Sequence, residues 1–243
     1  MPHLDNEKKG LKNLSPGEGF LPKPRKFYLG IFVNKAKKGR TFLDSLENWY
    51  RYEEELLHQG YTLVAGVDEA GRGPLAGPVV AAAVILPGRV FLPGLNDSKK
   101  VPSGRREELA HLIKQVALDW AVGISTVNEI ELLNIHFASL LAMRRAVKGL
   151  SVVPQFLLVD GRFPVDLSVP QRTLVGGDAS SASIAAASIL AKVTRDHLMQ
   201  ICHHLYPQYG FDRHKGYPTS AHRQALTRWG PSPLHRPGFR GVR

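Results

Sequence analysis

Two short apolar runs, separated by a turn rich in glycine and proline, most constrain the fold of this chain. Residues 61–67 read Tyr-Thr-Leu-Val-Ala-Gly-Val, and residues 79–86 read Val-Val-Ala-Ala-Ala-Val-Ile-Leu. Both runs are rich in β-branched and small side chains, which favours buried strands. The residues between them include three glycines and two prolines. We therefore expect a hairpin of two strands.

Two adjacent carboxylates, Asp68 and Glu69, directly follow the first run. In a regular strand they would point to opposite faces. For both to reach one site we expect the strand to break there, with Gly71-Arg72-Gly73-Pro74 making the break. Carboxylates that close repel each other and favour a divalent cation with oxygen ligands. On this motif alone, a surface pair before a turn remains an alternative.

Strands alternate with helices along the rest of the chain. We expect helices over residues 42–58, 104–116, 126–148 and 181–197, and strands over residues 120–124, 156–159 and 172–175. Thr126 and Glu129 have capping-box spacing. One stripe of the helix that they open holds Ile130, Leu133, Phe137, Leu140 and Leu141. This order predicts an α/β fold with a mixed central β-sheet flanked by helices.

The charge is unevenly distributed. The net charge is +11, yet residues 1–40 carry +7, residues 201–243 carry +6 and the residues between them carry −2. Basic ends around an acidic middle suit a polyanionic partner, although a basic solubilising surface remains an alternative. We expect a basic, largely flexible extension over residues 1–45, the α/β domain over residues 46–200 and a helical, turn-rich appendage over residues 201–243.

Cysteine content and hydropathy restrict the compartment. Cys202 is the single cysteine, so an intramolecular disulfide and a cysteine-rich zinc cluster are excluded and a reducing compartment is expected. Residues 1–19 lack a signal-peptide pattern, and the longest apolar run is far shorter than the ~20 residues of a membrane-spanning helix. We expect a cytoplasmic protein without a membrane partner.

Two further acids lie beside glycines near expected strand ends: Asp160 before Gly161, and Asp178 after Gly177. Strand ends are where sites collect in α/β sheets. Alone, each acid is adequately explained as a turn residue or, for Asp178, as a helix cap. Together with Asp68 and Glu69 they form a plausible two-metal site for phosphoryl displacement.

Residues 68–82 (Asp-Glu-Ala-Gly-Arg-Gly-Pro-Leu-Ala-Gly-Pro-Val-Val-Ala-Ala) closely resemble the signature of ribonuclease HII. Supporting motifs occur in family order at residues 95–100, 158–161, 177–178, 185–196 and 214–217. The resemblance covers residues 50–238. It implies an RNase H-like fold and an endonuclease, dependent on two Mg²⁺ or Mn²⁺ ions, that hydrolyses the RNA strand of RNA–DNA hybrids. It also implies nicking at single ribonucleotides in duplex DNA, leaving 5′-phosphate and 3′-hydroxyl ends.

The resemblance also implies residue roles. Asp68, Glu69, Asp160 and Asp178 match the metal-binding, catalytic carboxylates, with Asp68 bridging both ions. Gly71, Arg72 and Gly73 match the loop that reads the 2′-hydroxyl through its backbone, and Tyr217 matches the aromatic that packs on the sugar beside the RNA–DNA junction. Further substrate contacts on the phosphate side are expected from Ser98, Lys99, Lys192 and Lys215. The enzyme is expected to be a monomer.

Two rival functions are another metal-dependent nuclease on the same fold and a non-catalytic hybrid-binding protein. Several residues have plainer interpretations. We expect a structural ion pair for Asp196 with Arg195 or Arg72, and surface or phosphate-contacting positions for His214 and His235. We expect packing positions for Trp120 and Trp229, a helix-dipole role for Arg144 and Arg145, and a buried thiol at Cys202.

Overall fold

The hairpin expected from the two apolar runs forms the centre of the sheet. The computed structural model describes residues 49–242, so the extension expected over residues 1–45 and the start of the helix expected from residue 42 lie outside the described residues. Strands β1 (Val64–Ala70) and β2 (Val79–Ile85) pair antiparallel. Their ladder continues through Asp68 and Glu69 to Ala70. The expected break at Asp68 is therefore wrong: the backbone pairing with β2 holds both acids in a regular strand, and the chain turns only at Gly71, where φ is +102°.

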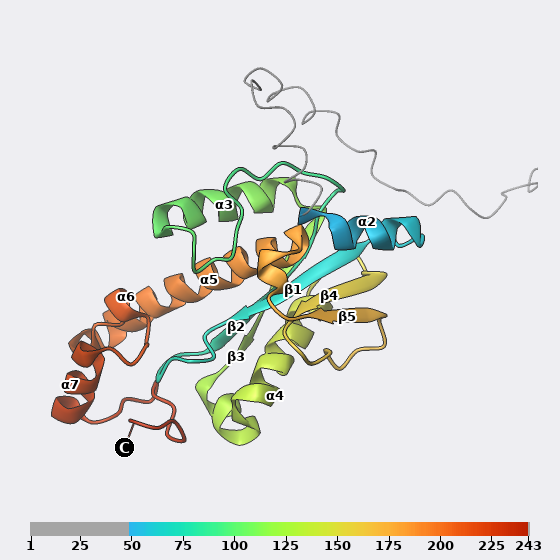
Figure 1. Cartoon of the computed structure of the whole chain (residues 1–243). Helices are drawn as coiled ribbons and strands as arrows, with labels where there is room; N and C mark the ends of the chain where they lie inside the picture. The colour runs from blue at the N-terminus through green and yellow to red at the C-terminus, as the bar shows by residue number, and fades with distance from the viewer. Residues whose placement is uncertain (1–48, 243) are drawn as a thin grey trace, which may run out of the picture. The chain divides into compact units, whose positions relative to one another are not determined.

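The described residues form one mixed sheet of five strands in the order β3-β2-β1-β4-β5 (Figure 1). The further strands are β3 (Asp119–Ser125), β4 (Phe156–Asp160) and β5 (Gln171–Leu174). Strand β3 pairs antiparallel with β2, whereas β4 pairs parallel with both β1 and β5. The carboxyl ends of β1, β3, β4 and β5 consequently share one edge of the sheet.

Helices cover both faces of this sheet. On one face lie α2 (Arg51–His58), α3 (Ser103–Val116) and α5 (Ala182–Leu205), and on the other lies α4 (Val127–Lys148). Alternate residues of β2 divide between the two cores: Ala82 and Val84 pack towards α3 and α5, and Ala81 and Ala83 pack towards α4. This alternation is the period of two that a strand buried on both faces requires.

The two longest helices approach the sheet most closely over glycines. A Cβ on Gly66 of β1 would lie 2.1 Å from the backbone carbon of Ser183 in α5, and one on Gly123 of β3 would lie 2.1 Å from the carbonyl oxygen of Ala142 in α4. Small residues of α5, such as Ala185 and Ala186, are fully buried. The expected close packing of this alanine-rich helix on the sheet is confirmed.

Helix α4 departs from the expected single stripe. Thr126 and Glu129 form the expected capping box, but Asn134 has non-helical angles (φ 63°, ψ 168°), and its Oδ1 accepts a hydrogen bond from the N–H of His136 at 2.9 Å. This kink changes the phase of the helix, leaving Leu133 40% and Phe137 56% exposed. The expectation that both belong to the buried stripe is therefore wrong.

Four residues with plain expected roles have specific contacts. Arg145 lies in the last turn of α4, where a helix-dipole role is expected, and it also donates two hydrogen bonds to the Glu129 carboxylate, at 2.6 and 2.8 Å. Arg144 pairs with Asp166 at 3.2 Å. Trp120 and Trp229 are exposed rather than packed in a core, and each carries a cation over its ring: Lys114 on Trp120 and Arg228 on Trp229.

The C-terminal segment packs against the end of α5 and the turn after β1. It contains the short helices η3 (Pro207–Tyr209) and α6 (Phe211–His214) and the longer α7 (Ser220–Trp229). Phe211, Met199 and Leu75 form the centre of a small core there. Across residues 49–242, no helix has the length and apolar character needed to cross a membrane.

Candidate active site

Strand pairing brings Asp68 and Asp160 together. Strands β1 and β4 are parallel with Val67 opposite Val159, so the next residue of each strand, Asp68 and Asp160, lies at the shared carboxyl edge. Both belong to the face covered by α5: Ala82, opposite Asp68, packs under α5, and Leu158, two residues before Asp160, packs on Ile184. Asp68 is 5% exposed.

Asp178 joins this pair through the turn after β5. The N–H of Gly177, in the 3₁₀ helix η2 (Gly177–Ala179), donates a hydrogen bond to Oδ1 of Asp160 at 2.7 Å. A Cβ on Gly177 would lie 2.6 Å from Cδ1 of Ile184, so a larger residue here would have to shift the Ile184 side chain. Asp178 is 7% exposed, and the cap of α5 is Ser181, whose side chain accepts from the N–H of Ile184. The alternative of Asp178 as the helix cap is therefore not observed.

Glu69 approaches the same edge from the opposite face of β1. Its strand partner Ala81 packs on the α4 side. The N–H of Glu69 donates to Oδ1 of Asp68 at 2.7 Å, and Oε1 of Glu69 accepts from Arg72 at 3.2 Å. The two acids thus remain neighbours although their side chains start from opposite faces.

Burial and mutual repulsion disfavour ionisation of these acids. The pKa of Asp68 is raised well above 3.8 by burial and by the charges of Glu69 and Asp160. Burial also raises the pKa of Glu69, which Arg72 opposes. Burial raises the pKa of Asp178, and Asp160 and Asp97 add to the effect. The mutual influence of Asp68, Glu69, Asp160 and Asp178 places them in one acidic cluster.

The donor set of this cluster fits a hard divalent cation. Four carboxylates supply oxygen ligands. An added cation would offset the negative charge that helps to raise the pKa values of Asp68, Glu69 and Asp178. Within residues 49–242, however, no group of three or more His, Cys, Asp or Glu side chains is already arranged to hold an ion. Oδ1 of Asp68 and Oδ1 of Asp160 instead accept backbone hydrogen bonds.

Ser98 and Lys99 lie beside the acids but differ in access. Ser98 is buried, and its hydroxyl oxygen is 2.9 Å from that of Ser188, which itself hydrogen-bonds Asp68. The Ser98 side chain therefore supports the acidic cluster from behind. Lys99 is exposed. Burial lowers its pKa, but the charges of Asp97, Asp178, Asp68 and Asp160 raise it more.

The glycine loop and Tyr217 are adjacent although they are distant in the sequence. A Cβ on Gly73 would lie 3.7 Å from Cε1 of Tyr217, and Nζ of Lys192 lies 5.9 Å from the centre of the Tyr217 ring. Lys192 also pairs with Asp196 at 2.7 Å, and Arg106 lies 3.6 Å from the same carboxylate. The expected ion pair of Asp196 is confirmed, but its partners are Lys192 and Arg106 rather than Arg195 or Arg72.

Lys215 is held by the segment that carries Tyr217. Its Nζ donates to the carbonyl oxygen of Asp212 at 2.6 Å, and its backbone is left-handed, with φ at 50°. His222 donates from Nδ1 to the carbonyl oxygen of Tyr217 at 2.9 Å, and its Nε2 lies 3.0 Å from Nε2 of His235. His235 is buried, which lowers its pKa to about 4. The expected surface position of His235 is therefore wrong.

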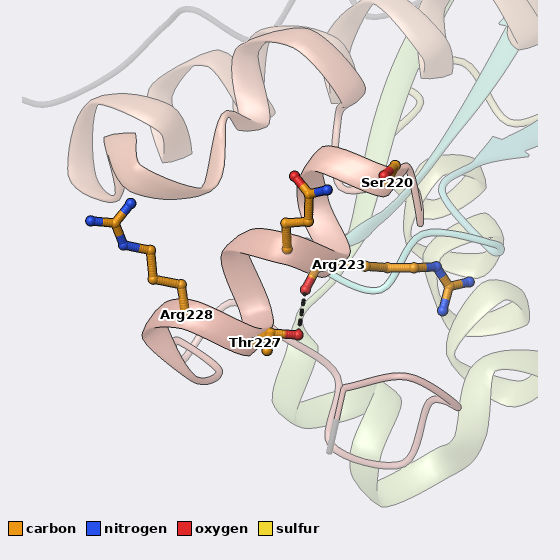
Figure 2. A pocket seen from close by; sticks show the side chains of 5 residues that line it. Ser220, Arg223, Thr227 and Arg228 are labelled. Atoms are coloured by element: carbon orange, nitrogen blue, oxygen red, sulfur yellow. Dashed lines mark hydrogen bonds between the residues drawn. The ribbon is translucent and has the colours of Figure 1, made fainter.

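An open hollow lies on α7, shortly after Tyr217 in the sequence. It has a volume of about 540 Å³ and is lined by Ser220, Arg223, Gln224, Thr227 and Arg228 (Figure 2). These positions recur at the spacing of one helical face. The hydroxyl of Thr227 donates to the carbonyl oxygen of Arg223 at 3.1 Å. The charged groups of this face are the guanidinium groups of Arg223 and Arg228.

No sequence motif marks the side chains that hold the glycine loop and residues 215–217 together. Arg195, His222 and Arg236 are all buried and hydrogen-bonded to the backbone of the glycine loop or of residues 215–217. Arg195 stands in a helix that is otherwise rich in apolar residues, and this was the available signal. His222 and Arg236 lie in a polar tail where nothing distinguishes them.

The chain is similar to known proteins over most of its described residues. A family model described as Ribonuclease HII matches residues 65–242. The ribonuclease HII of Pelotomaculum thermopropionicum is 62% identical over 202 residues, covering 82% of this chain and 76% of that protein. Among solved structures, the ribonuclease H2 of Pyrococcus horikoshii is similar with a TM-score of 0.63 at 27% identity, covering 74% of this chain and 94% of that one.

The fold extends to a more distant group. The structure of Bst-RNase HIII in complex with Mn²⁺ has a TM-score of 0.56 at 18% identity, covering 76% of this chain and 70% of that one. The expected mixed α/β, RNase H-like fold is thereby confirmed. The chain belongs to the ribonuclease HII family and is a divalent-metal-dependent endonuclease that cleaves the RNA strand of RNA–DNA hybrids.

Proposed function

We propose that Asp68, Glu69, Asp160 and Asp178 hold two divalent ions, Mg²⁺ or Mn²⁺, and that Asp68 lies between the two. Two ions, when bound, activate water and stabilise the leaving oxygen in an in-line phosphoryl displacement. The carboxylates orient these ions at the carboxyl edge of the sheet. The products carry 5′-phosphate and 3′-hydroxyl ends.

The glycine loop recognises the sugar. Backbone groups of Gly71, Arg72 and Gly73 bind the 2′-hydroxyl, which tells RNA from DNA, and the missing side chains permit close approach. Tyr217, next to Gly73, packs on the following sugar, where a second 2′-hydroxyl would be crowded. The enzyme therefore also nicks duplex DNA at a single ribonucleotide.

Basic groups on either side of this site grip phosphates. Lys99 lies next to the acids, and Lys192 and Lys215 lie around Tyr217. The hollow on α7 carries Arg223 and Arg228 and receives the phosphates of the duplex DNA beyond the junction. The proposed site needs no residue of a second copy, and we propose that the enzyme acts as a monomer. Its single cysteine suits a reducing compartment such as the cytoplasm.

The acidic cluster at the carboxyl edge is the observation that carries this proposal. The test is a nicking assay on a duplex with one ribonucleotide, with Mg²⁺, with Mn²⁺ or with a chelator. We expect cleavage with either ion and none with the chelator. Asp68→Asn should lower kcat by on the order of 10³-fold or more, because a ligand to both ions is lost.

Binding separates this loss from misfolding. Asp68→Asn should bind the uncut duplex with an affinity near that of the wild type, measured by fluorescence anisotropy. Lys148→Gln, an exposed change at the end of α4, is the matched control and should leave cleavage intact. Near wild-type turnover by Asp68→Asn would contradict the assignment.

A further inference from the structure

Arg236 is a buried cation whose guanidinium donates to the backbone of the glycine loop. It is 1% exposed. Its Nη1 donates to the carbonyl oxygens of Arg72 and Pro74 at 3.0 and 2.8 Å. Its Nη2 donates to those of Gly71 and Gly77, both at 2.7 Å, and Nε donates to Gly77 at 2.9 Å. Nη2 also lies 3.3 Å from the carbonyl oxygen of Pro78. One side chain therefore holds five carbonyl groups of the turn between Gly71 and Pro78.

Arg195 of α5 holds the same turn from the other side. It is also 1% exposed. Its Nε donates to the carbonyl oxygen of Pro78 at 3.0 Å, and its Nη2 donates to that of Ala76 at 3.1 Å. Its Nη1 donates to the carbonyl oxygen of Lys215 at 3.0 Å. Arg195 thus joins the glycine loop to the segment that carries Tyr217.

Among the described residues, no carboxylate forms an ion pair with either guanidinium, although the charge of Asp196 acts on Arg195. Within residues 49–242, neither guanidinium lies within ion-pair distance of an acid: the neighbouring Asp196 pairs with Lys192 and Arg106. Burial, followed by the charge of Arg195, lowers the pKa of Arg236 to about 9. Burying an unpaired charge is costly. Backbone carbonyl groups offset that cost for both residues, and the guanidinium of Arg236 also lies 5.0 Å from the centre of the Phe239 ring.

The loop is shaped around these two side chains. Gly71 and Gly77 have φ of +102° and +86°, and a Cβ on Gly71 would lie 2.1 Å from Nε of Arg195. With the carbonyl groups of Gly71, Arg72 and Pro74 bound to arginine, the loop has few acceptors left for solvent. The N–H groups of Arg72 and Gly73 donate no hydrogen bond within the described residues. The loop therefore presents donors and two underlying positive charges.

We propose that Arg236 and Arg195 are positioning residues that set the specificity of the glycine loop for a 2′-hydroxyl beside a phosphate. This inference rests on the proposed sugar-reading role of Gly71 to Gly73. The two guanidinium groups hold the loop so that its N–H groups are free to donate to the oxygen of a 2′-hydroxyl, an acceptor that deoxyribose lacks. Because Arg195 also holds Lys215, the same pair fixes the spacing between the loop and Tyr217.

Lysine substitutions test the proposal, because lysine keeps the charge and loses the planar fork. The variants are Arg236→Lys and, independently, Arg195→Lys. The matched control is Arg145→Lys, since Arg145 likewise donates to a backbone carbonyl, that of Ile124, but lies on α4. Met143→Ala, in the core under α4, controls for lost stability. All are assayed below the melting temperature of the least stable variant.

Two readouts separate positioning from general damage. The first is kcat and KM on a duplex with one ribonucleotide; the second is the Kd for the all-DNA duplex of the same sequence, which has no 2′-hydroxyl to read. For Arg236→Lys and Arg195→Lys we expect kcat/KM to fall by about 10- to 100-fold, the scale of a misplaced substrate. The Kd for all-DNA should stay near the wild-type value, and the two controls should cleave like the wild type.

Two results would overturn the inference: wild-type kcat/KM in both lysine variants, or equal losses of ribonucleotide cleavage and all-DNA binding in them. Asp68→Asn is run alongside. If Asp68→Asn stays active, the proposed metal site fails instead. If it is inactive while the lysine variants cleave normally, only the role of the two arginines is refuted.

Discussion

At the scale of single residues, Asp68 lowers the stability of the folded state when no cation is bound. Its pKa is raised above 3.8 by burial and by neighbouring acids, so the folded state binds its proton more tightly than the unfolded state. The penalty from this group is therefore absent at low pH and grows as pH rises from the unfolded pKa to the folded one. The penalty is fully present once the pH exceeds the folded pKa.

We therefore expect Asp68→Asn to stabilise the metal-free protein while it abolishes turnover. The free energy of unfolding at neutral pH should rise by about 1 kcal/mol, a typical value for a stabilising substitution. Thermal unfolding in a chelator measures it, and the difference should shrink at acidic pH. Added Mn²⁺ should raise the melting temperature of the wild type more than that of the variant. A variant less stable than the wild type in chelator would contradict this account.

The residues that could be predicted from the sequence are those whose position follows from local pattern. Asp68, Asp160 and Asp178 stand where an apolar run meets glycine, and such places are strand ends. The apolar surroundings of Arg195 mark it as unusual, but the contacts of Arg195 and Arg236 could not be predicted, because most of their partners are carbonyl groups more than 100 residues away. Backbone acceptors carry no sequence signal, so a side chain that binds them leaves no motif.

At the scale of elements, the contact between α5 and β1 depends on a missing side chain. Ser183 and Ile184 lie where a Cβ on Gly66 would be, and α5 in turn carries Ser188 against Asp68. A side chain at residue 66 would displace either the helix or the strand. The acidic cluster would then lose its support together with the core.

Gly66→Ala should therefore destabilise the protein by about 3 kcal/mol, the upper part of the range for overpacked cores. Gly104→Ala is the matched control, because nothing lies within 4 Å of the added Cβ in α3. It should be neutral or stabilise slightly, since alanine restricts the unfolded chain and favours a helix. Urea unfolding of both variants measures the difference, and equal stabilities would refute the close-approach argument.

The spacing of hydrophobic residues predicted which segments are helices and which are strands. It did not predict the path of the backbone at Asp68 or the kink in α4. The expected strand break at Asp68 fails because pairing with β2 outweighs the need of the acids to share a face. The stripe of α4 fails at Asn134, where a side-chain hydrogen bond to the next turn replaces the helical one. Both features depend on competition between alternative hydrogen bonds. The spacing of hydrophobic residues gives no information on that competition.

At the scale of the whole molecule, positive charge lies at the end of α5 opposite α2. Glu53 of α2 accepts from Ser183 at the start of α5, whereas α7 packs beyond Met199 near its end (Figure 1). The described part of the appendage thus extends a basic face beyond Tyr217. The predicted excess of charge in residues 201–243 suits duplex DNA there.

Salt dependence tests this surface. Each phosphate contact adds about 0.9 to the slope of log affinity against log salt, so Arg223→Ala and Arg228→Ala should each reduce the slope by about 1. Arg51→Ala, an exposed arginine on α2, should leave it unchanged. Anisotropy titrations of a duplex at several salt concentrations measure the slopes. An unchanged slope for both α7 variants would place the duplex elsewhere.

Helix α5 touches both halves of the proposed site. Ser188 supports Asp68, and Arg195, two turns later, holds the loop, so the supports are separated by about 10 Å of continuous helix. Because an α-helix keeps a fixed length, we expect cleavage at one fixed bond relative to the ribonucleotide, whatever the flanking bases. The position of the cleaved bond would then be set by the length of the helix between Ser188 and Arg195, and not by recognition of bases.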